Sequence, residues 1–399
     1  MKPRKVLHVF PYYIPPRATN ANGVKRVLLS LLAGLDRSRF EPILVCPAPS
    51  PFDRDFAEVG VRPLYVGDPQ HLILLRSRNP LALASYVPRF LKYRSCFIKL
   101  IKATQPVLVH SHVSAFLGAA AAARSLGVPS VIHIHEAGVR LPPWMYRLYN
   151  RAVMHWADHL ILVASFLLPH FSTMARRGRV TVINGGIDGT RFSPSPEHGS
   201  CRAQWGIKPH ELVLGFLGRL SPRKGAEYAI EAFSRIRQRV PHARLVIVGD
   251  IDSDRERWYR EALLGRVRRL GLGESVVFPG HAVDVRPTLQ SFDIQLFVSP
   301  QDDALGMVIV EGMAMARPIV AASSGGVSDI IVSDRNGVLL APRDVEGLAS
   351  AVVRLALDPS LRKRMGEAAR QTVVEKLNLA KFSASVESVY ETMLTGTAP

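Results

Sequence analysis

Cysteine and long apolar runs are both scarce in this sequence. Three of its 399 residues are cysteine, and Cys46, Cys96 and Cys201 lie far apart without the spacing of a metal site. Isolated thiols of this kind predict a reducing compartment and argue against a disulfide framework. No stretch contains the roughly 18 apolar residues that a membrane-spanning helix needs. The apolar run after the basic start stops at Pro11, too soon for a signal peptide, so we expect a cytoplasmic protein.

Carboxylates are scarce in the first half of the chain. Overall, 51 lysines and arginines stand against 33 aspartates and glutamates, which gives a net charge of +18. Residues 1–190 contain 24 of those cations and nine of the carboxylates, a net +15, and no carboxylate stands between Pro69 and His135. Such an excess indicates an anionic partner: nucleic acid, an acidic membrane surface or a phosphorylated ligand. Because no nucleic-acid-binding module accompanies the charge, we do not expect a nucleic-acid partner.

Short apolar runs alternate with helix-length segments along the whole chain. A chain of 399 residues exceeds a single hydrophobic core, and its 47% hydrophobic fraction is that of a globular protein. The alternation predicts βαβ units around parallel sheets. The first series of expected strands is 5–10, 42–46, 61–66, 107–110, 130–135 and 159–163, and the second is 212–217, 244–248, 275–278, 294–298 and 318–321. Helices are expected at 24–35, 115–126, 225–240, 255–270, 307–316, 345–357 and 378–394.

Glycine, proline and serine are dense between the two strand series, at Asn184–Gly189 and Phe192–Pro196. This composition is typical of a linker. We therefore predict an α/β fold with two Rossmann-like domains facing each other across a cleft, with ligands at the carboxyl ends of the strands. The expected boundaries are 1–188 for the N-terminal domain and 196–376 for the C-terminal domain. The last helix, within 377–399, has no strand after it and is expected to pack back on the N-terminal domain.

Three cations follow the first strand of the second series. The stretch Gly215–Gly225 places an apolar strand, a glycine-bearing loop, Arg219, Arg223, Lys224 and a helix start within eleven residues. A helix N-terminus with basic side chains beside it suits a phosphate or diphosphate. Arg219 can grip two oxygens in a planar fork, and Lys224 acts as a point charge. Solvated surface charges are the alternative interpretation.

Two carboxylates stand close to another helix start. Gly306 precedes an apolar helical run, so free backbone N–H groups are expected there for a second anion contact. Asp303 lies just before this helix and Glu311 lies on it, so both can face one pocket. A carboxylate suits sugar or ribose hydroxyls because it accepts two hydrogen bonds at once. The alternative for Asp302 and Asp303 is a helix cap, and we favour it for Asp302.

Together the two motifs resemble the group-1 family of retaining glycosyltransferases, which has the two-domain GT-B fold. The family's Gly-Arg-Leu…Lys-Gly stretch is similar to Gly218–Gly225, and its Glu-x7-Glu motif is similar to Asp303 and Glu311 with the helix and strand that follow. The resemblance spans nearly the whole chain and is strongest from about 179 to 337. Further matching segments are Val182–Phe192, Val248–Asp250, Phe278–His281 and Leu296–Pro300.

The resemblance implies a hexosyltransferase that moves a sugar from a nucleotide-diphosphate donor to a hydroxyl on a lipid-linked or cell-surface glycan, as in polysaccharide biosynthesis. Donor binding would use Arg219 and Lys224 on the diphosphate and Glu311 on the ribose. Asp303 would hold the transferred sugar, and His135 would lie near the acceptor and the reacting sugar. The implied catalytic residues are His135, Asp303, Arg219 and Lys224, and the implied donor-binding residues are Gly23, Arg219, Lys224, His281, Gly306, Met307, Val308 and Glu311.

Two positions depart from the family pattern. Asp303 stands where the family most often has glutamate, so its reach is one methylene shorter. Asn22-Gly23 stands where many members have two glycines, although Gly23 still precedes the first helix and would let the backbone approach a diphosphate closely. We expect no metal and no cofactor, because the two cations take the role of a metal ion.

Paired histidines support an alternative class of function. His110 and His112, and likewise His133 and His135, lie at the ends of neighbouring expected strands. Alternate strand residues share a face, so each pair can present two imidazoles as a metal-dependent hydrolase requires. No carboxylate or third pair completes a familiar zinc spacing, and we favour a structural role for His110 and His133. A non-catalytic sugar- or lipid-binding module is the other alternative.

The basic stretch 80–102 predicts a helix with two unlike faces. A peripheral contact with an anionic membrane would place the aromatic residues in the interface and the cations on lipid headgroups. The alternative is an ordinary domain helix with one face buried. The apolar residues are Phe90, Leu91, Phe97, Ile98 and Ile101, and the cations are Arg89, Lys92, Arg94, Lys99 and Lys102.

Overall fold

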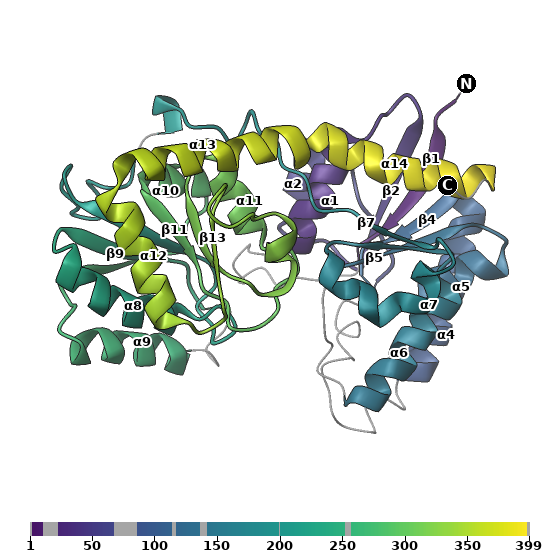
Figure 1. Cartoon of the computed structure of the whole chain (residues 1–399). Coiled ribbons are helices and arrows are strands. Elements are labelled where there is room, and N and C mark those ends of the chain that lie inside the picture. The colour runs from purple at the N-terminus through teal and green to yellow at the C-terminus, as the bar shows by residue number, and fades with distance from the viewer. Residues whose placement is uncertain are drawn as a thin grey trace. The chain divides into compact units, whose positions relative to one another are not determined.

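The computed structural model describes residues 2–10, 23–67, 86–113, 117–135, 142–198, 200–251 and 257–396. The chain forms two compact units. Unit 1 comprises the described residues within 1–17, 24–186 and 379–399, and unit 2 comprises those within 18–23 and 187–378. Each unit has its own parallel sheet and its own apolar core (Figure 1).

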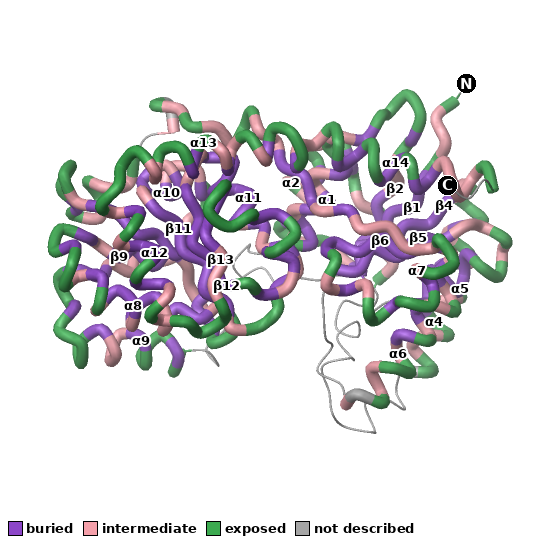
Figure 2. Tube along the Cα trace, viewed as in Figure 1, coloured by how far each residue is buried: buried purple, intermediate pink, exposed green. Residues whose placement is uncertain are grey.

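Unit 1 is built on a sheet whose described strands are all parallel, in the order β3-β2-β1-β4-β5-β6-β7. The strands are β1 (Arg4–Val9), β2 (Phe40–Cys46), β3 (Leu64–Tyr65), β4 (Leu108–Ser111), β5 (Ser130–Ile134), β6 (His159–Leu162) and β7 (Val180–Val182). The central strands are buried, as the tube in Figure 2 shows, because helices cover both faces of a parallel sheet. Six of the strands overlap predicted ones, and β7 was not predicted.

Helices cover both faces of the unit 1 sheet. Leu7 and Val109 point to the face that α4 and α5 cover, whereas Phe10 and Leu44 point to the face that α1 covers. The helices of unit 1 are α1 (Gly23–Gly34), α2 (Asp53–Glu58), α4 (Tyr86–Thr104), α5 (Leu117–Ser125), α6 (Pro143–Trp156), α7 (Ser172–Ala175) and α14 (Leu379–Thr395), with a 3-10 helix η3 (Ser165–Phe171).

Unit 2 repeats this architecture with a second parallel sheet, whose described strands run in the order β10-β9-β8-β11-β12-β13. Its strands are β8 (Leu212–Leu217), β9 (Ala243–Val248), β10 (Val276–Gly280), β11 (Ile294–Phe297), β12 (Ile319–Ala322) and β13 (Val338–Leu340). Its helices are α8 (Ala226–Arg239), α9 (Arg257–Arg269), α10 (Val285–Ser291), α11 (Met307–Ala314), α12 (Val345–Leu357) and α13 (Pro359–Lys376), with 3-10 helices η4 (Pro196–His198) and η6 (Gly325–Asp329).

Each sheet reverses its strand order once. In unit 1 the reversal lies between β1 and β4, and in unit 2 it lies between β8 and β11. At such a point the loops after two neighbouring strands diverge to opposite faces of the sheet, and ligands of doubly wound folds bind in the crevice that results. The strand order therefore marks one preferred ligand position in each unit.

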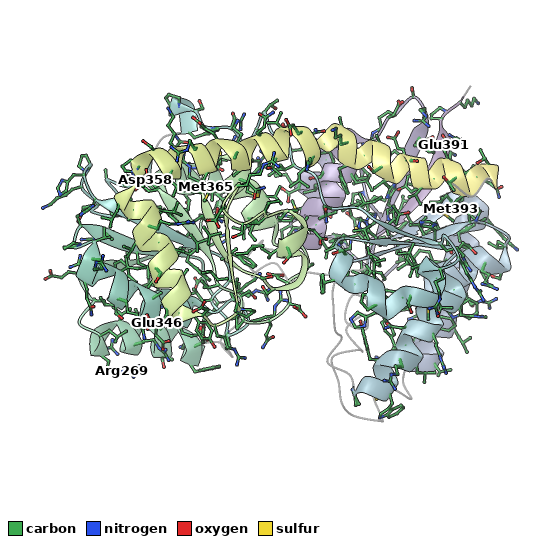
Figure 3. The ribbon with its side chains drawn as sticks, viewed as in Figure 1. Arg269, Glu346, Asp358, Met365, Glu391 and Met393 are labelled. Atoms are coloured by element: carbon green, nitrogen blue, oxygen red, sulfur yellow. The ribbon has the colours of Figure 1, made fainter. Side chains whose placement is uncertain are left out.

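The C-terminal helix α14 packs on the sheet of unit 1, as the sequence predicted. The Arg39 guanidinium bonds Glu387 Oε2 at 3.1 Å and Glu391 Oε1 at 2.7 Å, and Glu387 also accepts the Asp36 N–H at 2.8 Å. Glu391, labelled in Figure 3, pairs with Arg4 at the start of β1 as well. These bonds attach the end of the chain to its first two strands.

For the helix predicted within 80–102, the structure buries most of the apolar face inside unit 1. Phe97 and Ile101 are buried against α5 and the sheet, and Phe90 packs on the Trp156 ring at a centroid distance of 6.0 Å. The apolar face of α4 is therefore largely covered inside unit 1. Val87 and Leu91 remain exposed in its first two turns, and residues 80–85 lie outside the described part of the chain.

Two further features are the state of the three cysteines and the length of the apolar helices. Cys46, Cys96 and Cys201 are all free, and Cys46 is buried. Over the described residues, no helix combines the length and the apolar character needed to cross a membrane.

Candidate functional site

The loop between β8 and α8 carries the three cations that the sequence singled out. A turn closes it, with the Lys224 N–H bonded to the Ser221 carbonyl at 2.9 Å. Gly225 then starts α8 at φ +72°, and a Cβ at this position would lie 2.4 Å from the Val298 carbonyl oxygen. Only glycine combines this backbone conformation with such a close approach. The loop is therefore pressed against the chain that follows β11.

Side chains join this loop to the loop after β11. Lys224 Nζ forms an ion pair with Asp303 Oδ2, and Arg223 Nη2 lies 3.4 Å from Asp303 Oδ1. Ser299 donates its hydroxyl to the Arg223 carbonyl at 2.7 Å. Phe297 lies under the Lys224 ammonium, 5.6 Å from ring centroid to nitrogen. The reversal between β8 and β11 thus brings together residues that lie about eighty positions apart in the sequence.

The start of η6 makes hydrogen bonds to the loop that contains Asp303. The Gly326 N–H bonds the Asp303 carbonyl at 3.1 Å, and the Gly325 N–H bonds Asp302 Oδ1 at 3.0 Å. Gly325 has φ +64°, and a Cβ there would lie 1.9 Å from the Asp303 carbonyl oxygen. Asp302 therefore accepts an N–H at the start of η6 and does not cap α11, the helix for which we favoured a cap. The residue before α11 is Gly306, at φ +63°.

The first turn of α11 presents backbone donors beside this ion pair. Gly306, Met307 and Val308 stand at the helix start, where N–H groups have no partner within the helix. Glu311 lies one turn further on and is 2% exposed. The elements that carry Lys224, Asp303 and the start of α11 therefore meet at the position where the strand order predicts a ligand.

The electrostatics of the loop favour an anion. Burial raises the pKa of Asp303, but Lys224 and Arg223 lower it by more, so its pKa lies below the ordinary value and the carboxylate stays charged. Burial also lowers the pKa of Lys224, and Arg223 and Arg219 lower it further while Asp303 opposes them. Lys224 and Arg223 thus lie beside one buried carboxylate, and Arg219 acts on Lys224 as well, which leaves an excess of positive charge.

The other predicted site residues belong to other elements of the chain. His281 follows β10, two strands away from β8, and its side chain is exposed. Gly23 opens α1, and a Cβ there would meet no described atom within 4 Å, so the packing of the chain itself does not require glycine. His135 follows β5 in unit 1 and is buried.

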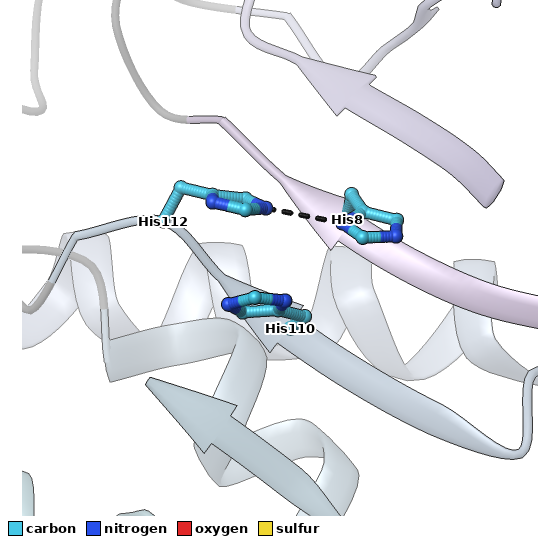
Figure 4. A group of neighbouring side chains, drawn as sticks. All are labelled: His8, His110 and His112. Atoms are coloured by element: carbon cyan, nitrogen blue, oxygen red, sulfur yellow. Dashed lines mark hydrogen bonds between the residues drawn. The ribbon is translucent and has the colours of Figure 1, made fainter. Parts of the chain in front are cut away.

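Five histidines share one face of the unit 1 sheet at the reversal between β1 and β4. His110 and His112 stack with ring centroids 4.1 Å apart, as do His133 and His135. A hydrogen bond joins His8 and His112, drawn as a dashed line in Figure 4, with 3.0 Å between His8 Nδ1 and His112 Nε2. His110 Nδ1 lies 2.6 Å from the Tyr390 hydroxyl. Each of the five rings is buried, and they are close enough for three to hold one metal ion.

Sequence reasoning found four of these histidines and missed His8. The alternation of the first strand could have located His8. Because His8 stands between Leu7 and Val9, it faces the same side of the sheet as Val6 and Phe10. That His8 lies opposite His110 follows only from the register of the β1–β4 pair, which the sequence does not give.

The histidine cluster is neutral. Burial lowers the pKa of His8 and His135 to about 3, and it lowers the pKa of His110, His112 and His133 well below the ordinary value. An imidazolium in this position would lose its hydration, and a second protonated ring beside it would add repulsion.

Unit 1 is expected to lose stability in acid because of this cluster. An unfolded histidine takes up a proton near pH 6.5 and a buried one does not, so the free energy of unfolding falls as the pH drops from about 6.5 toward 3. Each such histidine adds a slope of about 1.4 kcal/mol per pH unit. Denaturant titrations across this range, with a chelator present, measure the slope. His133→Gln should reduce it by one histidine's share, and a slope that the substitution leaves unchanged would contradict the account.

Solved structures identify the class of the fold. A glycosyltransferase from Rickettsia africae ESF-5 superposes with a TM-score of 0.80 at 19% identity and covers 100% of both chains. HepE of Anabaena, in complex with UDP-glucose, superposes with a TM-score of 0.79 at 21% identity and covers 98% of this chain and 100% of that one. With two Rossmann-like α/β units and a C-terminal helix on the first, the fold is GT-B, the fold of many glycosyltransferases.

Sequence relatives identify the family. The family model described as "Glycosyl transferases group 1" matches residues 211–358. The model described as "Glycosyltransferase Family 4" matches residues 21–191. A glycogen synthase of Mycobacterium tuberculosis is 30% identical over 300 residues, which cover 72% of this chain and 69% of the relative. A GDP-mannose-dependent alpha-(1-6)-phosphatidylinositol monomannoside mannosyltransferase of Mycolicibacterium smegmatis is 29% identical over 267 residues, 63% of this chain and 68% of that one.

The chain belongs to the group-1 glycosyltransferase family, and it is an enzyme of the glycosyltransferase class. The resemblance noted in the sequence is thereby confirmed. The sequence left two classes of enzyme open, a glycosyltransferase and a metal-dependent hydrolase. Membership of this family identifies the chain as a glycosyltransferase.

Proposed function

We propose that the enzyme transfers a hexose from a nucleoside-diphosphate sugar to an acceptor hydroxyl with retention of the anomeric configuration. The observation that carries this proposal is the group of cations after β8, paired through Lys224 and Asp303 with the loop that leads into α11. A diphosphate is the ligand that such a position suits, since it meets point charge, guanidinium and helix N-terminus together.

Each predicted residue of unit 2 has a role in this proposal. Arg219 and Lys224 bind the diphosphate, and the N–H groups of Gly306, Met307 and Val308 hold a second phosphate oxygen. Glu311 accepts the ribose hydroxyls, Asp303 binds the transferred sugar and His281 contacts the donor. Gly23, at the start of α1, is assigned to the donor, and His135 of unit 1 is assigned to the reacting sugar and acceptor. The family resemblance supports these assignments.

The chemical step is one of charge stabilisation. The bond between the anomeric carbon and the diphosphate breaks, and negative charge develops on the leaving phosphate. Arg219, Lys224 and the start of α11 stabilise that charge where it forms, so the reaction needs no metal ion. The acceptor oxygen bonds the anomeric carbon on the face that the phosphate leaves, and its proton passes to a phosphate oxygen.

Named relatives support the choice of donor class. HepE of Anabaena is described with UDP and with UDP-glucose, and the Mycolicibacterium relative is named as GDP-mannose-dependent. We therefore propose a hexose on a uridine or guanosine diphosphate. Asp303 reaches less far than the glutamate usual in the family, so it is the residue to examine for donor choice.

We also propose that the acceptor is a lipid-linked or cell-surface glycan intermediate, met on the cytoplasmic face of a membrane. The net +15 of residues 1–190 supports an anionic surface, and the three free thiols support a reducing compartment. Exposed apolar side chains remain at the starts of two unit 1 helices, with Val87 and Leu91 on α4 and Trp144 and Leu148 on α6. Apolar residues beside cations suit the interface of an anionic membrane.

The diphosphate site is tested with Lys224→Ala. Loss of this charge removes a contact that strengthens as the leaving group forms, so we expect kcat to fall by about 100- to 1000-fold. Turnover with UDP-glucose and with GDP-mannose is the measurement, and circular dichroism checks the fold. Lys208→Ala, which removes an exposed lysine of the same unit, is the control and should keep full activity.

Two outcomes would count against the proposal in different ways. Full activity of Lys224→Ala would contradict the assignment of the diphosphate site. A wild-type protein that binds nucleotide sugar and never transfers it, with any lipid-linked or soluble glycan acceptor, would favour the non-catalytic sugar-binding module.

Membrane contact is tested by flotation with vesicles. The wild type should float with vesicles that contain anionic lipid and not with neutral ones, and added salt should weaken the binding. Leu91→Glu should reduce flotation, because it places a carboxylate among the exposed residues of α4. Leu357→Glu makes the same exchange at an exposed leucine of unit 2 and should float like the wild type. Equal binding to neutral vesicles, or none to either, would overturn the membrane proposal.

A further inference from the structure

A glutamine stands in the middle of a buried strand of unit 2. Gln295 is fully buried on β11, between Ile294 and Leu296, which belong to the core that α8 and α12 cover. Because side chains alternate along a strand, Gln295 points to the opposite face of the sheet. A buried amide has two N–H groups and an accepting oxygen that have lost water, so it needs partners there.

The amide of Gln295 meets α11 at two places, one helical turn apart. Its Nε2 donates a hydrogen bond to the Val308 carbonyl at 3.0 Å, in the first turn of the helix. Its Oε1 occupies the space beside Gly312, where a Cβ would lie 1.5 Å from this oxygen. Val308 and Gly312 are four residues apart and therefore share one face of the helix. That face of α11 lies directly on the side chain of Gln295.

Only part of the bonding capacity of this amide is used. Gln295 Oε1 has no hydrogen-bond partner among the described residues, although it is buried. Turning the amide over would set its oxygen against the Val308 carbonyl and remove the one bond that it makes. An apolar side chain would fill this place without an unsatisfied oxygen, so simple packing does not account for glutamine. What glutamine adds at this position is the bond to the Val308 carbonyl.

We propose that Gln295 is a positioning residue of the donor site, which fixes the rotation of α11 about its own axis. The inference rests on the proposed function, in which Val308 offers its N–H to a phosphate oxygen and Glu311 accepts the ribose hydroxyls. Gln295 holds the carbonyl of Val308 itself, and Glu311 directly precedes Gly312. A rotation of the helix would move both donor-binding groups at once, and such groups work only when held to within about 0.5 Å.

Strand β11 is a firm support for this contact. Gln295 lies opposite Gly215 of β8 and opposite Ile319 of β12, so the strand is paired on both sides. Two residues further along, Phe297 lies under the Lys224 ammonium. The same strand therefore contacts the helix that would hold one part of the diphosphate and the lysine that would hold another.

Gln295→Met separates positioning from packing. Methionine fills the space of glutamine and cannot bond Val308, so thermal unfolding should be nearly unchanged while the affinity for UDP or GDP, measured by calorimetry, falls about 10-fold. Gln290→Met is the matched control, because Gln290 on α10 also has a buried amide oxygen without a described partner, and it should bind like the wild type. A Gln295→Met protein that binds as tightly as the wild type overturns the inference alone. A wild type that binds neither nucleotide contradicts the proposed function as well.

A second set of variants tests the contact with Gly312. Gly312→Ala drives a methyl group into the amide, so the midpoint of thermal unfolding and the nucleotide affinity should fall together. Adding Gln295→Val makes room for the methyl group, so the double variant should regain stability. Its affinity should stay low, because nothing then holds Val308. Recovery of both properties would show that Gln295 only fills space, and it would overturn the positioning role. If Gly312→Ala fails to fold, Gln295→Met decides.

Discussion

The ion pair between Lys224 and Asp303 is the interaction on which the candidate donor site depends. It holds the loop after β8 against the loop after β11, at the one place in unit 2 where the strand order reverses. Glycine is needed on both sides of this contact: Gly225 ends the loop after β8, and Gly325 at the start of η6 packs against the loop after β11, and a Cβ on either would strike a backbone carbonyl. Lys224 and Arg223 lower the pKa of Asp303, so the buried carboxylate stays charged. In return, the ion pair with Asp303 fixes the position of the Lys224 ammonium. The pair therefore preorganises the site before a ligand arrives.

The two units use the same point of the fold for opposite kinds of chemistry. At the reversal of strand order in unit 2 the side chains are charged, and the ion pair between Lys224 and Asp303 offsets the cost of burying their charges. At the reversal in unit 1 they are imidazoles, and burial keeps them neutral. A charged group suits the diphosphate of a donor, whereas a neutral imidazole suits hydrogen bonds within a buried cluster. Parallel sheets supply the position in each case, and the residue types decide what binds.

Much of the fold was predictable because its strands are short apolar runs, as β8 illustrates, and its helices repeat apolar residues at helical spacing, as α12 illustrates. Strands β7 and β13 were missed, since three residues are too few for a pattern. The sequence left two alternatives open for α4, because an amphipathic helix has the same periodicity whether α5 or lipid meets its apolar side. The motif residues of unit 2 were identifiable in sequence, but the pairing of Lys224 with Asp303 and the place of His8 depend on which strands are neighbours.

The measurement that tests the central claim most directly is a crystal structure of the enzyme with a bound nucleoside diphosphate. The account predicts diphosphate oxygens within about 2.7–3.2 Å of Lys224 Nζ, of the Arg219 guanidinium and of an N–H at the start of α11. It also predicts that Asp303 remains beside Lys224. A diphosphate bound elsewhere in the protein, with Lys224 and Arg219 making no contact to it, would contradict the account.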